Sequence, residues 1–255
     1  MRILLTNDDG IHAPGIFAAK NALAALGEVF VIAPERQRSA AGHAVTLHKP
    51  LRISSLRLSD GTEAHAVSGT PTDCVTLGYE IVMERNCDLV VSGINNGANL
   101  GWDLTYSGTV AAAFEGAILN LPSIAISVTA EDVSADKVIF SPAAAFLANV
   151  ARQLLSDPLP SHSFLNINVP NCLQENLTGV EITHQGRREY VDKVVASQDP
   201  RGRPYYWLAG SLKEVNPDPG ADVHAVLANR ISVTPVQLDL TDYRALERLR
   251  GWQLS

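Results

Sequence analysis

Short apolar runs alternate with longer segments of mixed polarity along the first two thirds of the chain. The apolar runs are rich in branched residues, which is typical of strands that are buried on both faces of a parallel sheet. Strands that alternate with helices imply right-handed crossovers, so the pattern predicts an α/β fold with a mostly parallel sheet flanked by helices. The expected strands are Arg2–Thr6 and residues 29–33, 89–92, 123–128 and 164–169.

The segments between the apolar runs carry the start and stop signals of helices. Thr70-Pro71 and Ser141-Pro142 each place a cap residue before a first-turn proline, which is a common way for a helix to begin. Gly27 follows an Ala- and Leu-rich stretch and provides a stop. The expected helices are residues 15–26, 70–83, 109–119 and 141–155.

From residue 178 onward the pattern changes to short strand-like runs separated by turns rich in Pro, Gly and Asp. We expect a C-terminal β-hairpin extension or antiparallel addition to the sheet, a returning strand, and a terminal helix capped by Thr241. The chain thus divides into a core, residues 1–175, and an arm, residues 176–255, within one structural unit. Exposed strand edges on such an arm invite pairing with a second subunit. The expected strands are residues 180–183, 189–196, 205–209 and 230–234, and the helix is residues 241–250.

Composition and charge narrow the classes of protein to which this chain can belong. Hydrophobic residues make up 46% of the 255 residues and charged residues 18%, which indicates a globular protein. The net charge of -7 argues against binding to a nucleic-acid duplex, which requires a basic face. An anionic substrate would therefore need local positive charge or backbone dipoles at its site.

The cysteines and the N-terminus predict a cytoplasmic protein. Cys74, Cys87 and Cys172 are scattered and lack the spacing of metal ligands, so we expect reduced core thiols. The first residues do not resemble a signal peptide, since an arginine and a short apolar run lead directly to acids. No apolar run approaches the roughly 18 residues that a membrane-spanning helix needs.

Two adjacent acids, Asp8 and Asp9, follow the first expected strand in the segment Asn7-Asp8-Asp9-Gly10. Like charges about 4 Å apart in a protein repel by about 4 kcal/mol, so a shared proton, water or a divalent cation must offset the repulsion. Gly10 permits a turn that would let both carboxylates face one ion. An ordinary Asp-Gly turn is the alternative.

Polar residues also follow the second and third expected strands. Because the carboxyl ends of parallel strands share one edge of the sheet, we expect these loops to meet the acids there. Ser39 lies in the first of these loops, and Asn95 and Asn96 lie in the second. Hydroxyl, amide and carboxylate oxygens suit Mg²⁺, Mn²⁺ or Ca²⁺ better than zinc. Turn chemistry alone is an alternative explanation of the Asn-rich loop. His43, in the first loop, either reaches the site or is an ordinary hydrogen-bonded loop histidine.

A third polar segment, Ser107-Gly108-Thr109, precedes an expected helix. Such a turn can hold a phosphate with backbone N–H groups and the helix dipole, although simple capping of the helix is the alternative. A metal next to an anion cradle suits phosphoryl chemistry. The chain has neither the G-x-G-x-x-G fingerprint after its first strand nor a P-loop motif. Acids stand where the pyrophosphate of a dinucleotide would lie, which argues against a Rossmann cofactor.

With these motifs taken together, the chain resembles the SurE family of stationary-phase survival proteins, which are metal-dependent phosphatases of nucleoside monophosphates. The resemblance extends over essentially the whole chain, and several rare motifs recur in order. Ala98 departs from the family, which often has proline there. The matching segments are residues 2–10 (RILLTNDDG), 33–43 (APERQRSAAGH), 68–75 (SGTPTDCV), 92–101 (SGINNGANLG), 106–111 (YSGTVA), 165–170 (LNINVP) and 232–235 (SVTP).

The resemblance implies a Rossmann-like core, one Mg²⁺ or Mn²⁺ per subunit, 5′- or 3′-nucleoside monophosphates as substrates, and dimers or tetramers with exchanged C-terminal arms. Three alternatives stay open: a covalent aspartyl-phosphate route, a nucleotide-binding regulator without turnover, and a purely structural oligomer. The implied roles are metal ligation by Asp8, Asp9, Ser39 and Asn95, catalysis by Asp8 and Asp9, and phosphate or substrate binding by Asn96, Ser107, Gly108 and Thr109.

Overall fold

Nine strands form one sheet within the residues that this computed structural model describes, which are 1–130, 137–191, 194–208, 211–212 and 218–254. The strands of the sheet are β1 (Arg2–Thr6), β2 (Glu28–Pro34), β3 (Ile53–Arg57), β4 (Glu63–Val67), β5 (Leu89–Asn96), β6 (Ser123–Thr129), β7 (Ser163–Pro170), β8 (Gly179–Ile182) and β13 (Arg230–Gln237). The α-helices are α1 (Pro14–Leu23), α2 (Pro71–Leu77), α3 (Gly108–Ile118), α4 (Ser141–Ser156), α5 (Asp222–Leu227) and α6 (Tyr243–Leu249).

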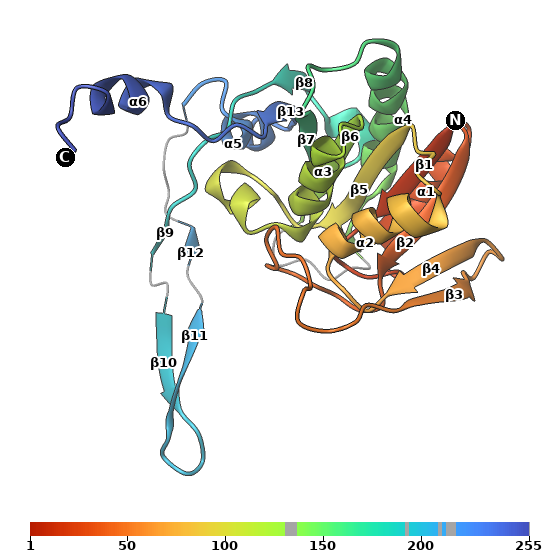
Figure 1. The fold of residues 1–255 in the computed structure, drawn as a ribbon, viewed down its shortest axis with the longest axis horizontal. Coiled ribbons are helices and arrows are strands. Elements are labelled where there is room, and N and C mark those ends of the chain that lie inside the picture. Colours follow the sequence, from red (N-terminus) through yellow and green to blue (C-terminus); the bar gives the residue numbers. More distant parts are fainter. Residues whose placement is uncertain (131–136, 192–193, 209–210, 213–217, 255) are drawn as a thin grey trace.

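The order of the strands across the sheet is β3-β4-β2-β1-β5-β6-β7-β13-β8 (Figure 1). The strands from β4 to β7 in this order run parallel to one another. On either side of these parallel strands the sheet continues with an antiparallel pairing. β3 pairs antiparallel with β4, and β13 pairs antiparallel with β7. The predicted mostly parallel α/β sheet is therefore confirmed.

Helices cover both faces of the sheet, and the side chains of β1 show how the sequence specifies this arrangement. Ile3 and Leu5 are fully buried in the cluster that includes the inner faces of α1 and α4. Leu4 points the other way and is fully buried in the cluster that includes residues of α2 and α3. This alternation follows from the two-residue period of a strand. Across the described residues, no helix is both long and apolar enough to cross a bilayer.

The arm leaves the sheet after β8 and extends away from the core as a long antiparallel hairpin (Figure 1). Its outer pair is β10 (Val194–Gln198) with β11 (Pro204–Leu208), and its inner pair is β9 (Tyr190–Val191) with β12 (Ser211–Leu212). The predicted hairpin is thus present, although residues 192–193 and 209 of its expected strands lie outside the described residues. The chain then returns through α5 to β13, and α6 projects beyond the sheet.

Several local predictions were wrong in detail. The helix expected over residues 70–83 is α-helical only as far as Leu77 and continues as a π-helical turn, Gly78–Val82. Thr70 does cap this helix, but the N-cap position of α4 is Phe140 rather than Ser141. Asp242, whose side chain accepts hydrogen bonds from two following backbone N–H groups, caps α6 in place of Thr241. The antiparallel pair β3 and β4 and the short helix α5 were not predicted.

Candidate active site

The carboxyl ends of β1 and β5 form the candidate site. β1 lies between β2 and β5, so the chain winds away from β1 in both directions. Open parallel sheets bind ligands outside the carboxyl ends of their strands at such a reversal. The acids that follow β1 and the asparagines that end β5 meet at this point, as the sequence predicts.

A tight turn after β1 positions the acid pair. The side chain of Asn7 closes it, since its Nδ2 donates to the carbonyl of Gly10 at 3.0 Å and its Oδ1 accepts from the N–H of Gly10 at 3.1 Å. Gly10 has a φ of +100°, a conformation that other residues rarely adopt. The turn expected at Gly10 is therefore present, and Asp8 and Asp9 lie within it.

Asp8 is buried against the first turn of α3. Its Oδ1 accepts a 2.5 Å hydrogen bond from the hydroxyl of Thr109, which lies 101 residues away in the sequence. A Cβ added to Gly108 would lie only 2.8 Å from the Cβ of Asp8, so this approach requires glycine. Burial raises the pKa of Asp8 to about 6; the charge of Asp9 acts in the same direction and the Thr109 hydrogen bond opposes it.

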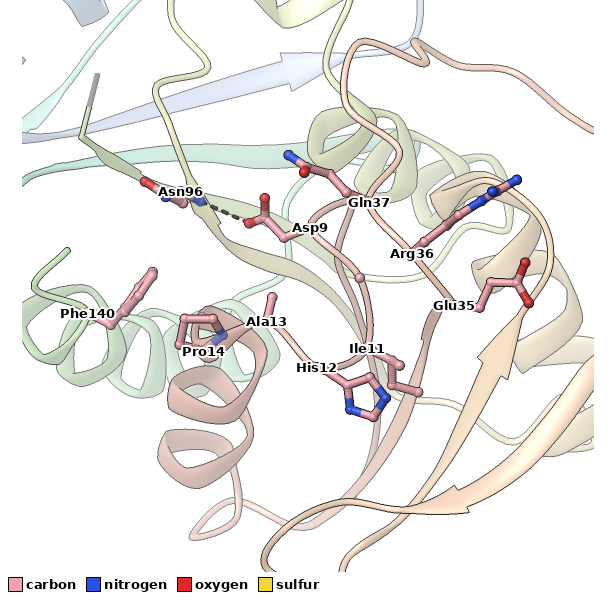
Figure 2. Close-up of a pocket in the computed structure, with 12 residues that line it drawn as sticks. Asp9, Ile11, His12, Ala13, Pro14, Glu35, Arg36, Gln37, Asn96 and Phe140 are labelled. Carbon is pink, nitrogen blue, oxygen red and sulfur yellow. Dashed lines mark hydrogen bonds between the residues drawn. The ribbon is translucent and has the colours of Figure 1, made fainter. Parts of the chain in front are cut away.

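Asp9 faces the end of β5. Its Oδ2 accepts a 3.1 Å hydrogen bond from the backbone N–H of Asn96 (Figure 2). Burial raises the pKa of Asp9 as well, against the effect of this hydrogen bond. Both members of the pair are thus carboxyl groups whose ionised form the protein disfavours when no cation is present.

The end of β5 is irregular, and this irregularity shapes the Asn95–Asn96 segment. The register of β5 against β6 shifts between Ser92 and Asn95, which indicates a bulge. The side-chain nitrogen of Asn95 donates to the carbonyl of Gly97 at 2.8 Å. Its amide nitrogen thus makes a hydrogen bond within the loop, and its amide oxygen is the atom that can ligate a cation.

The loop after β2 lies over the acid pair. The backbone N–H of Arg38 donates to the carbonyl of Asp8 at 2.7 Å. The neighbouring Ser39 is exposed, and its hydroxyl accepts a 2.8 Å hydrogen bond from Gln37. Among the described residues Ser39 makes no hydrogen bond to either carboxylate of the pair, so its role as a ligand stays a prediction.

A second set of contacts ties this loop to α3. The Nε2 of His43 lies 2.9 Å from the Oε2 of Glu115, and its ring centroid lies 4.8 Å from that of Phe114. The N–H of Gly42 donates to the carbonyl of Tyr106 at 2.9 Å, just before the predicted phosphate turn. His43 is therefore a hydrogen-bonded loop histidine that connects the loop of Ser39 to the helix behind Thr109.

The predicted phosphate turn is built into the start of α3. Ser107 caps the helix, since its hydroxyl accepts from the N–H of Val110 at 3.1 Å. The capping alternative therefore describes the hydroxyl of Ser107, whereas Thr109 directs its hydroxyl to Asp8. Ser107 and Thr109 are both buried. The N-terminus of α3, with its partial positive charge, therefore lies beside the buried carboxyl group of Asp8, and phosphate binding at this turn stays a prediction.

The donor set fits one hard divalent cation. In the part of the chain that the structure describes, no three His, Cys, Asp or Glu residues cluster as a metal site. The predicted set instead combines two carboxylates with a hydroxyl and an amide, all of which supply the oxygen that Mg²⁺ and Mn²⁺ prefer. Desolvation is the main cause of the raised pKa values of Asp8 and Asp9, and a bound cation would offset it.

Comparison with known proteins shows which family this site belongs to. The family described as "Survival protein SurE" matches residues 3–192 of the chain. The chain belongs to the SurE family. The resemblance seen in the sequence motifs is therefore confirmed.

Relatives in the SurE family match this chain over nearly their full lengths. A protein named 5′-nucleotidase SurE from Geobacter sulfurreducens is 49% identical over all of this chain and 95% of the relative. Another protein of that name, from Caldanaerobacter subterraneus subsp. tengcongensis, is 42% identical over 99% of this chain and 98% of the relative. The crystal structure of the SurE protein from Aquifex aeolicus is 40% identical, covers 98% of both chains and superimposes with a TM-score of 0.84.

Some parts of this SurE site could not be found in the sequence. Glu115 lies within an expected helix with no motif around it, yet it anchors the loop of Ser39 through His43. Phe140, which belongs to no motif in the sequence, lines a cavity beside Asp9 (Figure 2). Neither residue is adjacent in sequence to its partners, and only packing brings them there.

Proposed function

We propose that this chain is a divalent-metal-dependent phosphatase that hydrolyses nucleoside monophosphates, a 5′-nucleotidase like the relatives that carry that name. The observation that carries the proposal is the acid pair at the end of β1, in which buried Asp8 bonds to Thr109 at the N-terminus of α3 and partly buried Asp9 bonds to Asn96 at the end of β5. A cation site that adjoins an anion site is what transfer of a phosphoryl group to water needs.

The proposed metal ligands are Asp8, Asp9, Ser39 and Asn95. A bound Mg²⁺ or Mn²⁺ would neutralise charge on the phosphoryl group and lower the pKa of a water molecule. The ionised carboxylates of Asp8 and Asp9 are unfavourable without a cation. A bound cation would make the same ionised carboxylates favourable.

The chain's own residues would bind and orient the reacting groups. In this proposal the turn Ser107–Thr109 and the first-turn N–H groups of α3 would hold phosphoryl oxygens, and Asn96 would contribute from the end of β5. One of the two aspartates would orient the attacking water or accept its proton. Attack by an aspartate itself is the competing route, and a trapped phosphorylated chain would favour it.

The arm supports a proposal about assembly. Tyr206 and Trp207 on β11 are 64% and 65% exposed, although large aromatic side chains are usually covered. We propose that a second copy of the chain covers them in a dimer or tetramer with exchanged arms. Residues 1–175 would then carry the site and residues 176–255 the assembly, in a cytoplasmic protein.

The experiment that tests the function is an assay of phosphate released from a panel of nucleoside monophosphates. We expect EDTA to abolish release and added Mg²⁺ or Mn²⁺ to restore it. Asp8→Asn should lose most of the activity, whereas the exposed Asp157→Asn should retain it. Near-normal turnover by Asp8→Asn, or activity that is indifferent to EDTA, would contradict the assignment.

A second experiment tests the amide ligand. Asn95→Ala should require more metal for half-maximal activity, because one neutral oxygen donor is lost. An unchanged metal titration would show that Asn95 is not a ligand.

A further inference from the structure

A cavity of about 420 Å³ adjoins the acid pair on the side of Asp9 (Figure 2). This size lies within the range of about 300–1,000 Å³ that is usual for small-ligand sites. The proposed roles of Asp8 and of the turn before α3 leave this cavity without a function. Its lining comes from the loop before α1, the loop after β2, the end of β5 and the start of α4, namely residues 9–15, 35–37, Asn96 and Phe140.

The two acids face different parts of the site. Asp8 contacts Thr109 and lies against Gly108 at the start of α3, where the phosphate turn is. Asp9 contacts the N–H of Asn96 and lines the cavity. A phosphomonoester whose phosphoryl group lies over the acid pair therefore has the α3 turn on one side and this cavity on the other. The cavity is the space that the ester's leaving group would enter.

The lining has an apolar side and a polar side, as a nucleoside requires. Figure 2 shows Phe140 next to Pro14 at one side of the cavity, whereas Arg36 and Gln37 lie at the other. Phe140 contributes an aromatic ring to this lining, and every nucleobase can stack on the face of such a ring. The polar side supplies donors and acceptors for the edge of a base.

Phe140 is held where it lines the cavity. A Cβ added to Gly15 would lie 3.1 Å from Cε1 of Phe140 and 1.9 Å from the carbonyl of Ile94. The absence of a side chain at Gly15 therefore lets α1, β5 and the start of α4 meet closely. Phe140 is also partly buried against the core cluster that α1 and α4 share, which restricts its motion.

We propose that this cavity binds the nucleoside of the substrate, with the base stacked on Phe140, and that Phe140 determines the preference for nucleotides over other phosphomonoesters. This inference rests on the proposed function. It adds that recognition of the base is separate from recognition of the phosphate, since different residues on opposite sides of the acid pair perform the two tasks.

The test compares two substrates that share a phosphate and a ribose. Adenosine 5′-monophosphate carries a base, and ribose 5-phosphate does not. Phe140→Leu should raise the KM for the nucleotide about tenfold, within what loss of base stacking costs, and should leave the KM for ribose 5-phosphate within about twofold. The kcat values should change little. Phe140→Tyr, which keeps the ring, should restore the low KM for the nucleotide.

A matched control comes from the same helix. Phe146 lies on α4, of which Phe140 is the N-cap residue, and it is partly buried against the same core cluster but lines a different hollow. Phe146→Leu should therefore show no difference between the two substrates. The proposal is overturned if Phe140→Leu affects both substrates equally or neither, or if Phe146→Leu produces the same selective rise in KM.

Binding of adenosine separates this inference from the proposed function. Adenosine carries no phosphate, so ligand-observed NMR can follow its binding to the full chain without turnover. We expect contact signals from the base protons with the wild-type protein and much weaker signals with Phe140→Leu. Those signals would support the cavity even if no nucleotide were hydrolysed, and their absence, or their persistence in the variant, would overturn it.

Discussion

Asp8→Asn is expected to stabilise the metal-free protein at neutral pH while it abolishes activity. The ionised carboxylate of Asp8 is buried next to Asp9, and burial raises its pKa from 3.8 to about 6. A carboxyl group with a raised pKa holds its proton more tightly in the folded chain than in the unfolded chain. The contribution of Asp8 to the free energy of unfolding is therefore fully present below pH 3.8 and is lost as the pH rises through about 6.

The magnitude follows from the size of the shift. A rise of about 2 units at about 1.4 kcal/mol per unit lowers the stability of the metal-free protein by about 3 kcal/mol at neutral pH. Asn at position 8 still offers an oxygen to the hydroxyl of Thr109 but carries no charge. The variant should therefore keep the stability that the wild type loses at neutral pH. The difference between their free energies of unfolding should disappear near pH 4.

The assay is urea unfolding in EDTA at about pH 4 and about pH 8, which reports the free energy of unfolding through the linear dependence on denaturant. Asp157→Asn removes an exposed carboxylate and should show the wild-type dependence on pH. The reasoning fails if Asp8→Asn and the wild type lose equal stability between the two pH values. A bound Mn²⁺ should reverse the order of stability at the higher pH.

Two further substitutions test how the site is held. Gly108→Ala places a Cβ 2.8 Å from that of Asp8. This overpacking should lower the free energy of unfolding by about 1–3 kcal/mol and weaken activation by metal. Urea and Mn²⁺ titrations that match the wild type would contradict this close approach. His43→Ala removes the contact with Glu115 that holds the loop of Ser39, so several-fold more metal should be needed for activity. His43→Gln, which can still donate to Glu115, should recover most of the loss, and equal behaviour of the two variants would argue against positioning.

Much of the fold follows from local patterns. The positions of β1, β2, β5, β6 and β7 and the helix cap at Thr70 could be predicted because a buried strand and a capped helix each leave a short-range signature. The pair β3 and β4 leaves a weaker signature in the sequence. Much of β3 is exposed, so its sequence lacks the apolar run that marks a buried strand. The six-residue helix α5 is too short for a helical period to be distinct.

The sequence by itself determined that two acids stand at the end of the first strand, and that oxygen-bearing loops follow its neighbours. That much depends on chain order and on the rule that parallel strands end at one edge. Only the tertiary structure decided that Thr109 bonds to Asp8, that Glu115 holds His43, and that Phe140 faces the cavity beside Asp9. These contacts join segments distant in the chain, and their geometry depends on how the helices pack on the sheet, which no local pattern encodes.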